Sequence, residues 1–480
     1  MFTGAAHDHP QGDRRHTSAT RISGGQEPTR TPVASAREAG ATGPGRVGRL
    51  QALRSASRLS RGGRTLAAGL RSDPDQRVVA ALALLVATLG LMPVALVPAD
   101  SAIYAGVATG TPTLYTYTVA IAVVLVVVAM RTPRRLGRSL FLWVPFLIWM
   151  AVFAVLSWDA SPRTVSGLLH LSLAAVVFAI GAAAERADRR HSILLWAFAA
   201  VAWIQLLASI AAIAGFPLRR ISGQQALDVL GRATGLTSHP GELAKLLFFC
   251  GLCALTLPQR AVRDRWVAWT TLGAVLVGVS LTQSRTVLAA VVSMVVILVL
   301  LEFVTGRWQK RYFIVLGLTA LLALVSLPWL IERFTADPGG GSRQHLLGVA
   351  WTVIRDNPWT GVGPNSYVAV VGTIDPLTAS GVPVHNAFLL SAAELGILGA
   401  VLLWLPFART ATVAVRAVFR TRTPELAPRV LVSALPGLVL IGMTGWGLMQ
   451  GPYFLTLALV TGYFLARTRS GGVASGDGRD

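Results

Sequence analysis

The sequence predicts an all-α polytopic membrane protein with about 12 transmembrane helices, on three observations. Of its 480 residues, 53% are hydrophobic and 14% are charged, whereas a soluble domain carries about 25% charged residues. The hydrophobic residues gather into blocks of about twenty, the length that crosses roughly 30 Å of hydrocarbon. The formal net charge is +21, and most basic residues fall in short loops between these blocks. The charge therefore indicates a membrane rather than a nucleic acid, and an ordinary cytosolic enzyme is excluded.

The N-terminal segment cannot form a hydrophobic core of its own. Residues 1–76 are rich in Gly, Ser, Thr, Pro and Arg, with 12 Arg against 6 acidic residues and no sustained hydrophobic run. Such a composition buries too little surface to offset chain entropy, so we expect a disordered basic cytoplasmic tail. The first hydrophobic block comes too late in the sequence for a cleavable signal peptide.

The hydrophobic blocks within residues 78–466 form the predicted twelve-span transmembrane domain, and residues 467–480 form a second cytoplasmic tail. The predicted spans are Val78–Val97, Thr113–Met130, Leu140–Leu156, Val165–Ala184, Ser192–Ala214, Gly241–Leu257, Trp266–Thr282, Thr286–Val304, Tyr312–Leu330, Val384–Phe407, Val430–Met449 and Tyr453–Ala466.

The distribution of Lys and Arg predicts the orientation of these spans. With the N-terminal tail inside, the inner loops and the C-terminal end hold 21 basic residues and the outer loops hold 8. Because cytoplasmic loops collect Lys and Arg, both termini are predicted to be cytoplasmic. The long loops 215–238 and 331–383 then lie outside. Within the second loop, Ser342–Asn357 has hydrophobic residues at helical spacing, which predicts an amphipathic helix.

The basic residues on the outer side need an explanation other than topology. Arg285 lies in a tight turn between the seventh and eighth spans, at the predicted membrane boundary. A cation in that position usually has an anionic partner. The alternative is a side chain that extends to the headgroups of the outer leaflet.

Three predicted spans begin on the outer side with basic or histidine residues. Arg232 and His239 precede the sixth span, Arg285 opens the eighth, and His385 opens the tenth. The start of a helix offers unpaired N–H groups and a partial positive charge. If the three helix starts converge, they form a site for an anion such as diphosphate. The convergence is a hypothesis at this point.

His385 is the candidate general base. Nearby positive charge would favour the neutral imidazole, which is the form that a general base needs. On a straight helix, Ala392, Gly396 and Gly399 would share the face of His385 and allow another helix to approach closely. Glu394 would point to the opposite side and be a poor partner. The alternative interpretation is a histidine hydrogen-bonded at a helix interface.

Two further pairs are given structural interpretations. Glu242 and Lys245, three residues apart at the mouth of the sixth span, are predicted to neutralise each other rather than to act in chemistry. Cys250 and Cys253 form a C-x-x-C pair, but both lie in a hydrophobic block, where a thiolate would be costly. They are interpreted as packing residues. The outer side contains no Asp-x-Asp pair or carboxylate cluster, so no metal and no other cofactor is predicted.

Four motifs together resemble those of the O-antigen ligase and polymerase superfamily of bacterial membrane glycosyltransferases. His385-Asn386 is followed, after nine residues, by Gly396-Ile397-Leu398-Gly399. Pro358–Tyr367 is similar to the P-x-x-G-x-G segment of that family, and Arg232–Gly235 and Ser284–Arg285 resemble its two arginine motifs. The resemblance covers roughly residues 232–399.

The resemblance implies a GT-C-like, metal-independent, inverting glycosyltransferase in the bacterial plasma membrane. Its donor would be a glycan on a polyprenyl diphosphate at the outer face, and its acceptor a glycan or a lipid. Arg232 and Arg285 would bind the diphosphate, and His385 would take the proton from the acceptor hydroxyl. Further candidates for substrate binding are Arg219, Arg220, Arg343 and His239.

Three functions stay open at this point. A ligase would transfer the glycan to a separate acceptor, and a polymerase would join it to another lipid-linked unit. A twelve-span transporter is the third, but one with paired repeats should show matching halves and polar residues or broken helices near mid-membrane. Here the halves differ and the polar residues lie at the outer boundary.

Overall fold

A computed structural model describes residues 73–91, 94, 96, 114–156, 162–216, 232–307, 309–336, 341–419, 425–449 and 451–473. Within these residues the regular secondary structure is helical and contains no strand, which confirms the all-α prediction. Nearly all of the predicted N-terminal tail, most of loop 215–238 and the end of the C-terminal tail lie outside the described residues.

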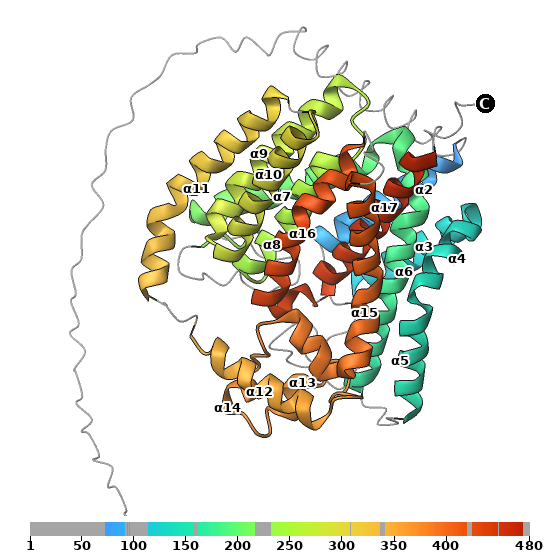
Figure 1. Ribbon diagram of the computed structural model, residues 1–480, viewed down its shortest axis with the longest axis vertical. Helices are drawn as coiled ribbons and strands as arrows, with labels where there is room; N and C mark the ends of the chain where they lie inside the picture. The colour runs from blue at the N-terminus through green and yellow to red at the C-terminus, as the bar shows by residue number, and fades with distance from the viewer. Residues whose placement is uncertain are drawn as a thin grey trace, which may run out of the picture. The chain divides into compact units, whose positions relative to one another are not determined.

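Each predicted span coincides with one helix, and four shorter helices (α4, α12, α13 and α14) lie between them (Figure 1). The helices are α2 (Pro74–Gly90), α3 (Thr116–Arg131), α4 (Pro133–Leu140), α5 (Val144–Leu156), α6 (Pro162–His191), α7 (Ile193–Ile213), α8 (Pro240–Thr256), α9 (Val262–Thr282), α10 (Arg285–Val304), α11 (Lys310–Ala336), α12 (Arg343–Asp356), α13 (Tyr367–Val371), α14 (Pro376–Ala379), α15 (Ala387–Phe419), α16 (Leu426–Thr444) and α17 (Gly451–Val473). Two 3₁₀ turns, η1 (Phe141–Trp143) and η2 (Trp446–Leu448), connect neighbouring helices.

The lengths of the helices identify a multi-pass membrane protein. Eight helical stretches among the described residues are long and apolar enough to cross a bilayer: 133–155, 163–191, 193–213, 262–282, 285–304, 312–329, 387–419 and 426–444. Three of the remaining predicted spans are shorter helices, because α2, α3 and α8 have 17, 16 and 17 residues. The total of twelve spans therefore stays a prediction.

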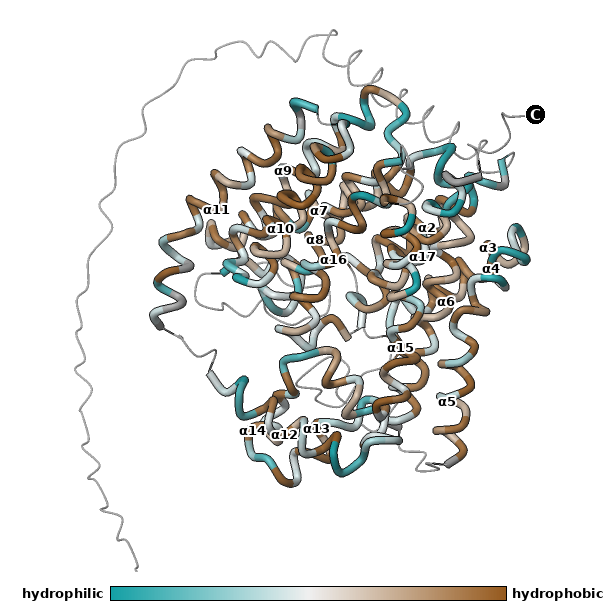
Figure 2. The backbone as a smooth tube through the Cα atoms, viewed as in Figure 1, coloured by the Kyte–Doolittle hydropathy of each residue, from teal (hydrophilic) through white to brown (hydrophobic). Residues whose placement is uncertain are grey.

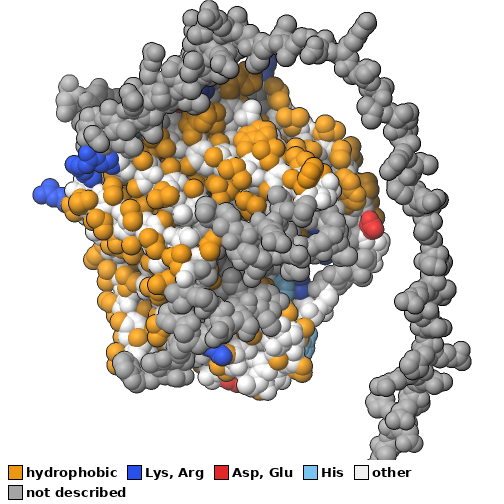
Figure 3. Space-filling model, turned by 180° about the vertical axis from the view of Figure 1, so that it is seen from behind, with side chains coloured by type: hydrophobic (Ala, Val, Ile, Leu, Met, Phe, Trp, Pro, Cys, Tyr) orange, Lys and Arg blue, Asp and Glu red, His pale blue; other side chains and the backbone are white. Residues whose placement is uncertain are grey.

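The exposed surface of these helices is largely hydrophobic. On α11, for example, Ile314, Leu321 and Leu324 are exposed although they are large and apolar. Figure 2 shows hydrophobic residues along most of the span helices, and Figure 3 shows hydrophobic side chains over much of one face. In water such a surface would drive aggregation, whereas a lipid bilayer accommodates it.

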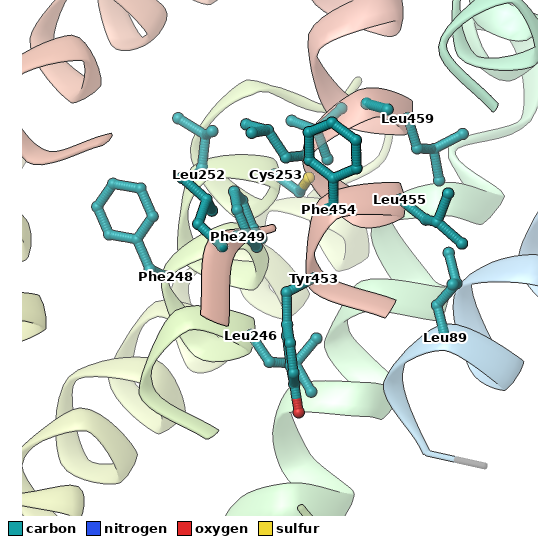
Figure 4. Packing of buried hydrophobic residues seen from close by; sticks show 14 of the residues in the cluster. Leu89, Leu246, Phe248, Phe249, Leu252, Cys253, Tyr453, Phe454, Leu455 and Leu459 are labelled. Carbon is teal, nitrogen blue, oxygen red and sulfur yellow. The ribbon is translucent and has the colours of Figure 1, made fainter. Parts of the chain in front are cut away.

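Small residues allow the span helices to pack closely. A methyl group added at Gly181 of α6 would lie 2.2 Å from the backbone oxygen of Leu459 in α17, and one added at Gly462 would lie 2.0 Å from that of Phe178. Close backbone approach through small residues is the usual way in which helices associate in membranes. Figure 4 shows the neighbouring core, where Cys253 lies among hydrophobic side chains. Cys250 and Cys253 are buried free thiols, in line with their interpretation as packing residues.

Buried and partly buried ion pairs connect the helix ends at one side of the bundle. The Nε of Arg429, at the start of α16, lies 3.0 Å from a carboxylate oxygen of Glu302, at the end of α10. Arg467 of α17 lies 3.4 Å from Glu425, and Arg189 of α6 contacts the same carboxylate at 3.5 Å. Because charges are costly at membrane depth unless they are paired, these contacts fix the helix ends relative to one another.

The three helices α12, α13 and α14 form a lobe, defined here as residues 341–386, beside the first half of α15 (Figure 1). α12 covers the predicted amphipathic segment except for its two end residues and packs its buried face against α15. A short hydrogen bond of 2.6 Å joins Nε2 of His345 to the buried Asp375. Asp375 also accepts from the backbone N–H of Thr378 at 2.7 Å, which caps α14.

The helix α15 is broken at Gly396, where φ is 71° and ψ is 169°. The break leaves backbone N–H and C=O groups of α15 without partners inside the helix. The segment Pro358–Gly363 of the lobe forms hydrogen bonds with them. Two of its N–H groups donate to the carbonyls of Ala393 and Glu394, at 2.8 and 2.9 Å. In return, the N–H of Ile397 donates to the carbonyl of Pro358 at 2.8 Å. The expectation of a straight helix through Gly396 is therefore wrong.

Side chains complete this junction between the lobe and α15. The indole N–H of Trp149, on α5, donates to the carbonyl of Leu395 at 3.3 Å. The carboxylate of Glu394 accepts the backbone N–H of Tyr367 at 3.3 Å, so it faces the lobe and does not pair with His385. A methyl group at Gly396 would lie only 2.0 Å from the carbonyl oxygen of Trp359.

This packing predicts that Gly396→Ala destabilises the protein strongly. The substitution adds a clash with the backbone of Trp359 and places alanine in a backbone region open to glycine alone, at a combined cost of about 2 kcal/mol or more. Thermal unfolding in detergent should show a lower midpoint. The matched control is Gly317→Ala on α11, where an added methyl meets nothing within 4 Å and the midpoint should hardly move. An equal midpoint for both variants would contradict the described junction.

Candidate functional site

The starts of three helices meet around the end of α16, defined here as Gly442–Gly445. A methyl group at Gly442 would lie 2.8 Å from the ring of Phe388, in the first turn of α15. The hydroxyl of Thr444 donates to that of Thr286, in the first turn of α10, at 3.1 Å. The Cβ position of Gly445 lies 3.8 Å from the ammonium nitrogen of Lys245 on α8. Residues far apart in the sequence, at the starts of α8, α10 and α15, are therefore brought together.

Arg232 and Arg285 lie at the junction between α9 and α10. The buried Arg232 donates from Nε to the carbonyl of Thr282, the last residue of α9, at 2.9 Å. Gln283 then adopts a left-handed conformation with φ of 51°, which ends α9. Arg285 is the first residue of α10 and is partly exposed. The structure thus anchors the guanidinium of Arg232 at the end of α9, three residues before Arg285 in the sequence.

His385 lies just before α15 and is partly buried. Its Nδ1 has no hydrogen-bond partner among the described residues. Burial and the positive charge of Arg343, in that order, lower the pKa of His385 to about 4; a hydrogen bond with the backbone of Pro383 opposes this, and the charges of Lys245 and His239 add to it. The imidazole is therefore neutral at neutral pH and takes up a proton only as the pH falls toward about 4.

Two of the expected properties of His385 need correction. His385 precedes the helix, so it does not share a helical face with Ala392, Gly396 and Gly399. The close approach expected at Gly396 does occur, but the neighbour is the backbone of Trp359 rather than another span. What holds His385 in place is the junction of the lobe with α15, which a hydropathy pattern cannot reveal.

The further candidates are placed as follows. His239 caps the start of α8, because its Nδ1 accepts the N–H of Gly241 at 3.0 Å. Arg343 is exposed at the start of α12, close enough for its charge to act on His385. Arg219 and Arg220 lie outside the described residues.

Glu242 and Lys245, which are predicted to neutralise each other, form no direct ion pair among the described residues, although the charge of Glu242 acts on Lys245. The carboxylate of Glu242 accepts hydrogen bonds from the N–H and the hydroxyl of Ser238, the first at 3.0 Å, and from the hydroxyl of Tyr453 at 3.3 Å. Figure 4 shows the hydroxyl of Tyr453 pointing away from the hydrophobic cluster. Lys245 stands out in the sequence as the single Lys or Arg inside a predicted span, whereas no sequence pattern points to Tyr453 or Thr444.

The arrangement suits an anion more than a metal ion. Arg285, Lys245 and Arg343 bring positive charge to the starts of helices whose own N–H groups favour anions. Within the part of the chain that the structure describes, no group of three or more His, Cys, Asp or Glu side chains could hold a metal ion.

A comparison with known protein families agrees with this arrangement. A family model described as O-antigen ligase matches residues 269–404, which include Arg285, Arg343 and His385. Arg232 and Lys245 precede the matched segment. No curated protein matches the chain. The match confirms the resemblance that the motifs indicated.

The electrostatics predict that Arg343 contributes, after burial, to the lowered pKa of His385. Arg343→Gln removes the positive charge with the largest effect, so the pKa of His385 should rise from about 4 toward its ordinary value of 6.5. Titration of the imidazole by NMR, with the resonance assigned from a His385→Gln variant, would measure this. The control is Arg355→Gln, an exposed residue at the other end of α12, which should leave the pKa unchanged. No change with Arg343→Gln would contradict the placement of Arg343 near His385.

Proposed function

Because residues 269–404 match the O-antigen ligase family model, we propose that this chain transfers a glycan from a polyprenyl-diphosphate carrier to an acceptor hydroxyl. The observation that supports the proposal is the meeting of three helix starts around the end of α16, together with the positive charges of Arg343 and Lys245 that act on the neutral His385. Cell-surface polysaccharide biosynthesis is the corresponding cellular role.

Arg232 and Arg285 would bind the diphosphate of the donor. A departing diphosphate gathers negative charge, and cations held outside bulk water stabilise such charge well. The hydrogen bond from Arg232 to the carbonyl of Thr282 fixes the orientation of its guanidinium before substrate arrives. Arg285 occupies the first turn of α10, where the helix dipole adds a partial positive charge.

His385 would act as the general base in a single displacement. The acceptor oxygen forms a bond to the anomeric carbon while its proton passes to the imidazole. The bond from the anomeric carbon to the diphosphate oxygen breaks at the same time, and the diphosphate leaves with the electron pair. One displacement inverts the configuration. The support is that His385 is held neutral at neutral pH and that its Nδ1 has no partner among the described residues.

The remaining parts of the proposal concern location and cofactors. The charge distribution along the sequence supports cytoplasmic termini and an extracytoplasmic site in the bacterial plasma membrane. Because Arg232 and Arg285 would stabilise the negative charge of the departing diphosphate, the proposed mechanism needs no metal ion. Polymerisation of lipid-linked units is the alternative, because donor and chemistry would be the same. A transporter is less well supported, since the break in α15 is filled by backbone of the lobe.

The deciding experiment supplies purified protein with an undecaprenyl-diphosphate-linked glycan, with and without a separate acceptor. A single adduct indicates a ligase, and a ladder of products indicates a polymerase. His385→Gln should lower the rate by about 10²–10⁴-fold, the usual contribution of a general base. A metal chelator should leave the rate unchanged. Full activity of His385→Gln, or a loss with chelator that a divalent cation restores, would overturn the mechanism.

The shape of the guanidinium predicts a loss of activity in Arg285→Lys. Lysine keeps the charge but loses the planar fork that binds phosphate through two hydrogen bonds. We expect kcat/KM for the lipid-linked donor to fall about tenfold or more, which corresponds to about 1.4 kcal/mol. The control is Arg355→Lys on the exposed end of α12, which should be as active as the wild type. Equal activity of both variants would remove Arg285 from direct contact with the diphosphate.

A further inference from the structure

Lys245 is a charged residue within a hydrophobic helix to which the proposed mechanism assigns no role. It lies five residues into α8, about 7 Å from the start of the helix at a rise of about 1.5 Å per residue. The chain has only one other lysine, Lys310, which is exposed at the start of α11. A lysine at this depth in a membrane protein is costly and typically marks a functional contact.

Within the described residues, the ammonium group of Lys245 has neither a hydrogen bond nor an ion pair. The nearest carboxylate along the helix belongs to Glu242, but Ser238 and Tyr453 occupy that group. By contrast, the buried Arg429 at the opposite end of the bundle is paired with Glu302 at 3.0 Å. Arg429 is therefore paired directly with a carboxylate, whereas the charge of Glu242 acts on Lys245 without a direct ion pair.

Lys245 contacts the end of α16, which in turn contacts the start of α10 and the start of α15. Its ammonium nitrogen lies 3.8 Å from the Cβ position of Gly445, next to Thr444, whose hydroxyl bonds to Thr286 beside Arg285. On the other side, the end of α16 contacts Phe388 through Gly442, three residues after His385. The Nδ1 of His385 is also without a partner among the described residues. The ammonium group of Lys245 and the start of α15, which follows His385, thus both lie near the end of α16.

We propose that Lys245 binds the diphosphate of the lipid-linked donor as a further cation of the site, next to Arg285. This inference rests on the proposed function. The ligand would bring a negatively charged group into direct contact with Lys245, which has no ion pair among the described residues and is influenced only by the charge of Glu242. Diphosphate carries enough charge to engage a lysine in addition to the two arginines. An ammonium group offers three rotatable donors on a flexible stem. It can therefore follow the phosphate oxygens as the bond to the sugar breaks.

Binding of farnesyl diphosphate and farnesyl monophosphate to the purified full-length protein tests the inference. Lys245→Met, which keeps most of the length of the side chain and removes the charge, should weaken the binding of farnesyl diphosphate about tenfold or more. The loss should be smaller for the monophosphate. Lys310→Met is the matched control and should bind both ligands as the wild type does. Lys245→Arg should bind farnesyl diphosphate more tightly than Lys245→Met.

Thermal unfolding of the unliganded protein provides a second test, in which the same variant should gain stability although it loses affinity. Lys245→Met removes an ammonium group from a hydrophobic helix, so the unfolding midpoint of the unliganded protein should rise. The additional stabilisation by farnesyl diphosphate should be lost. A purely structural lysine would give a lower midpoint or a variant that does not accumulate, and either result overturns the inference. Binding within twofold of the wild type, or an equal loss for both farnesyl ligands, also overturns it.

The same measurements separate this inference from the proposed function. If the wild type binds neither farnesyl ligand, the proposed donor is wrong, and the inference is overturned with it. If Arg285→Lys weakens farnesyl diphosphate and Lys245→Met does not, the donor site stands and the role of Lys245 alone is wrong.

Discussion

The exchange of backbone hydrogen bonds at the break in α15 is the constraint on which the site depends. A helix interrupted at Gly396 leaves N–H and C=O groups without their intrahelical partners, and each unsatisfied group would cost several kcal/mol in hydrocarbon, as an order of magnitude. The segment Pro358–Gly363 supplies those partners. The lobe therefore cannot separate from α15 without exposing the broken helix, so the two behave as one structural unit.

This unit determines where His385 lies. The first half of α15 is tied to the lobe at one end and contacts the end of α16 through Phe388 near the other. Asn386 accepts the N–H groups of Phe388 and Leu389 at 3.0 and 3.1 Å and so begins the helix directly after His385. The same lobe carries Arg343 on α12, which brings its charge to the imidazole. One junction thus sets both the position and the protonation of the candidate base.

Hydrophobic patterning predicted most of the helices but not their interruptions. Blocks of about twenty apolar residues are a strong signal, because crossing the hydrocarbon requires that length. All twelve predicted spans coincide with helices, although three of the helices are too short to settle the count. Gly396 was misread as a packing residue on a straight helix, since a glycine in a hydrophobic run is compatible with either role. Only the fold shows that Trp359 lies against it.

The candidate site was predictable in its parts and not in its assembly. Lys and Arg collect in cytoplasmic loops, so basic residues in the predicted outer loops need another explanation. This argument identifies Arg232, Arg285 and Arg343 as candidates. The pairing of Glu242 with Lys245 was expected from their spacing, but the spacing says nothing of Tyr453, which reaches Glu242 from a helix more than two hundred residues later. Long-range partners of this kind decide which charges are compensated, and a single sequence does not contain them.

The groups that lie next to the charged side chains of the candidate site bear on the proposed binding of an anion. The charges with the largest effect on His385 are positive, and Arg232 is stabilised by the carbonyl of Thr282, at the negative end of the α9 dipole, through its Nε. A carbonyl satisfies a donor without cancelling its charge, whereas a carboxylate would do both and would compete with an incoming diphosphate. Glu242 is held instead by neutral groups of Ser238 and Tyr453. A diphosphate bound as proposed would add its negative charge next to Arg285 and Lys245, in addition to the charge of Glu242 that already acts on Lys245.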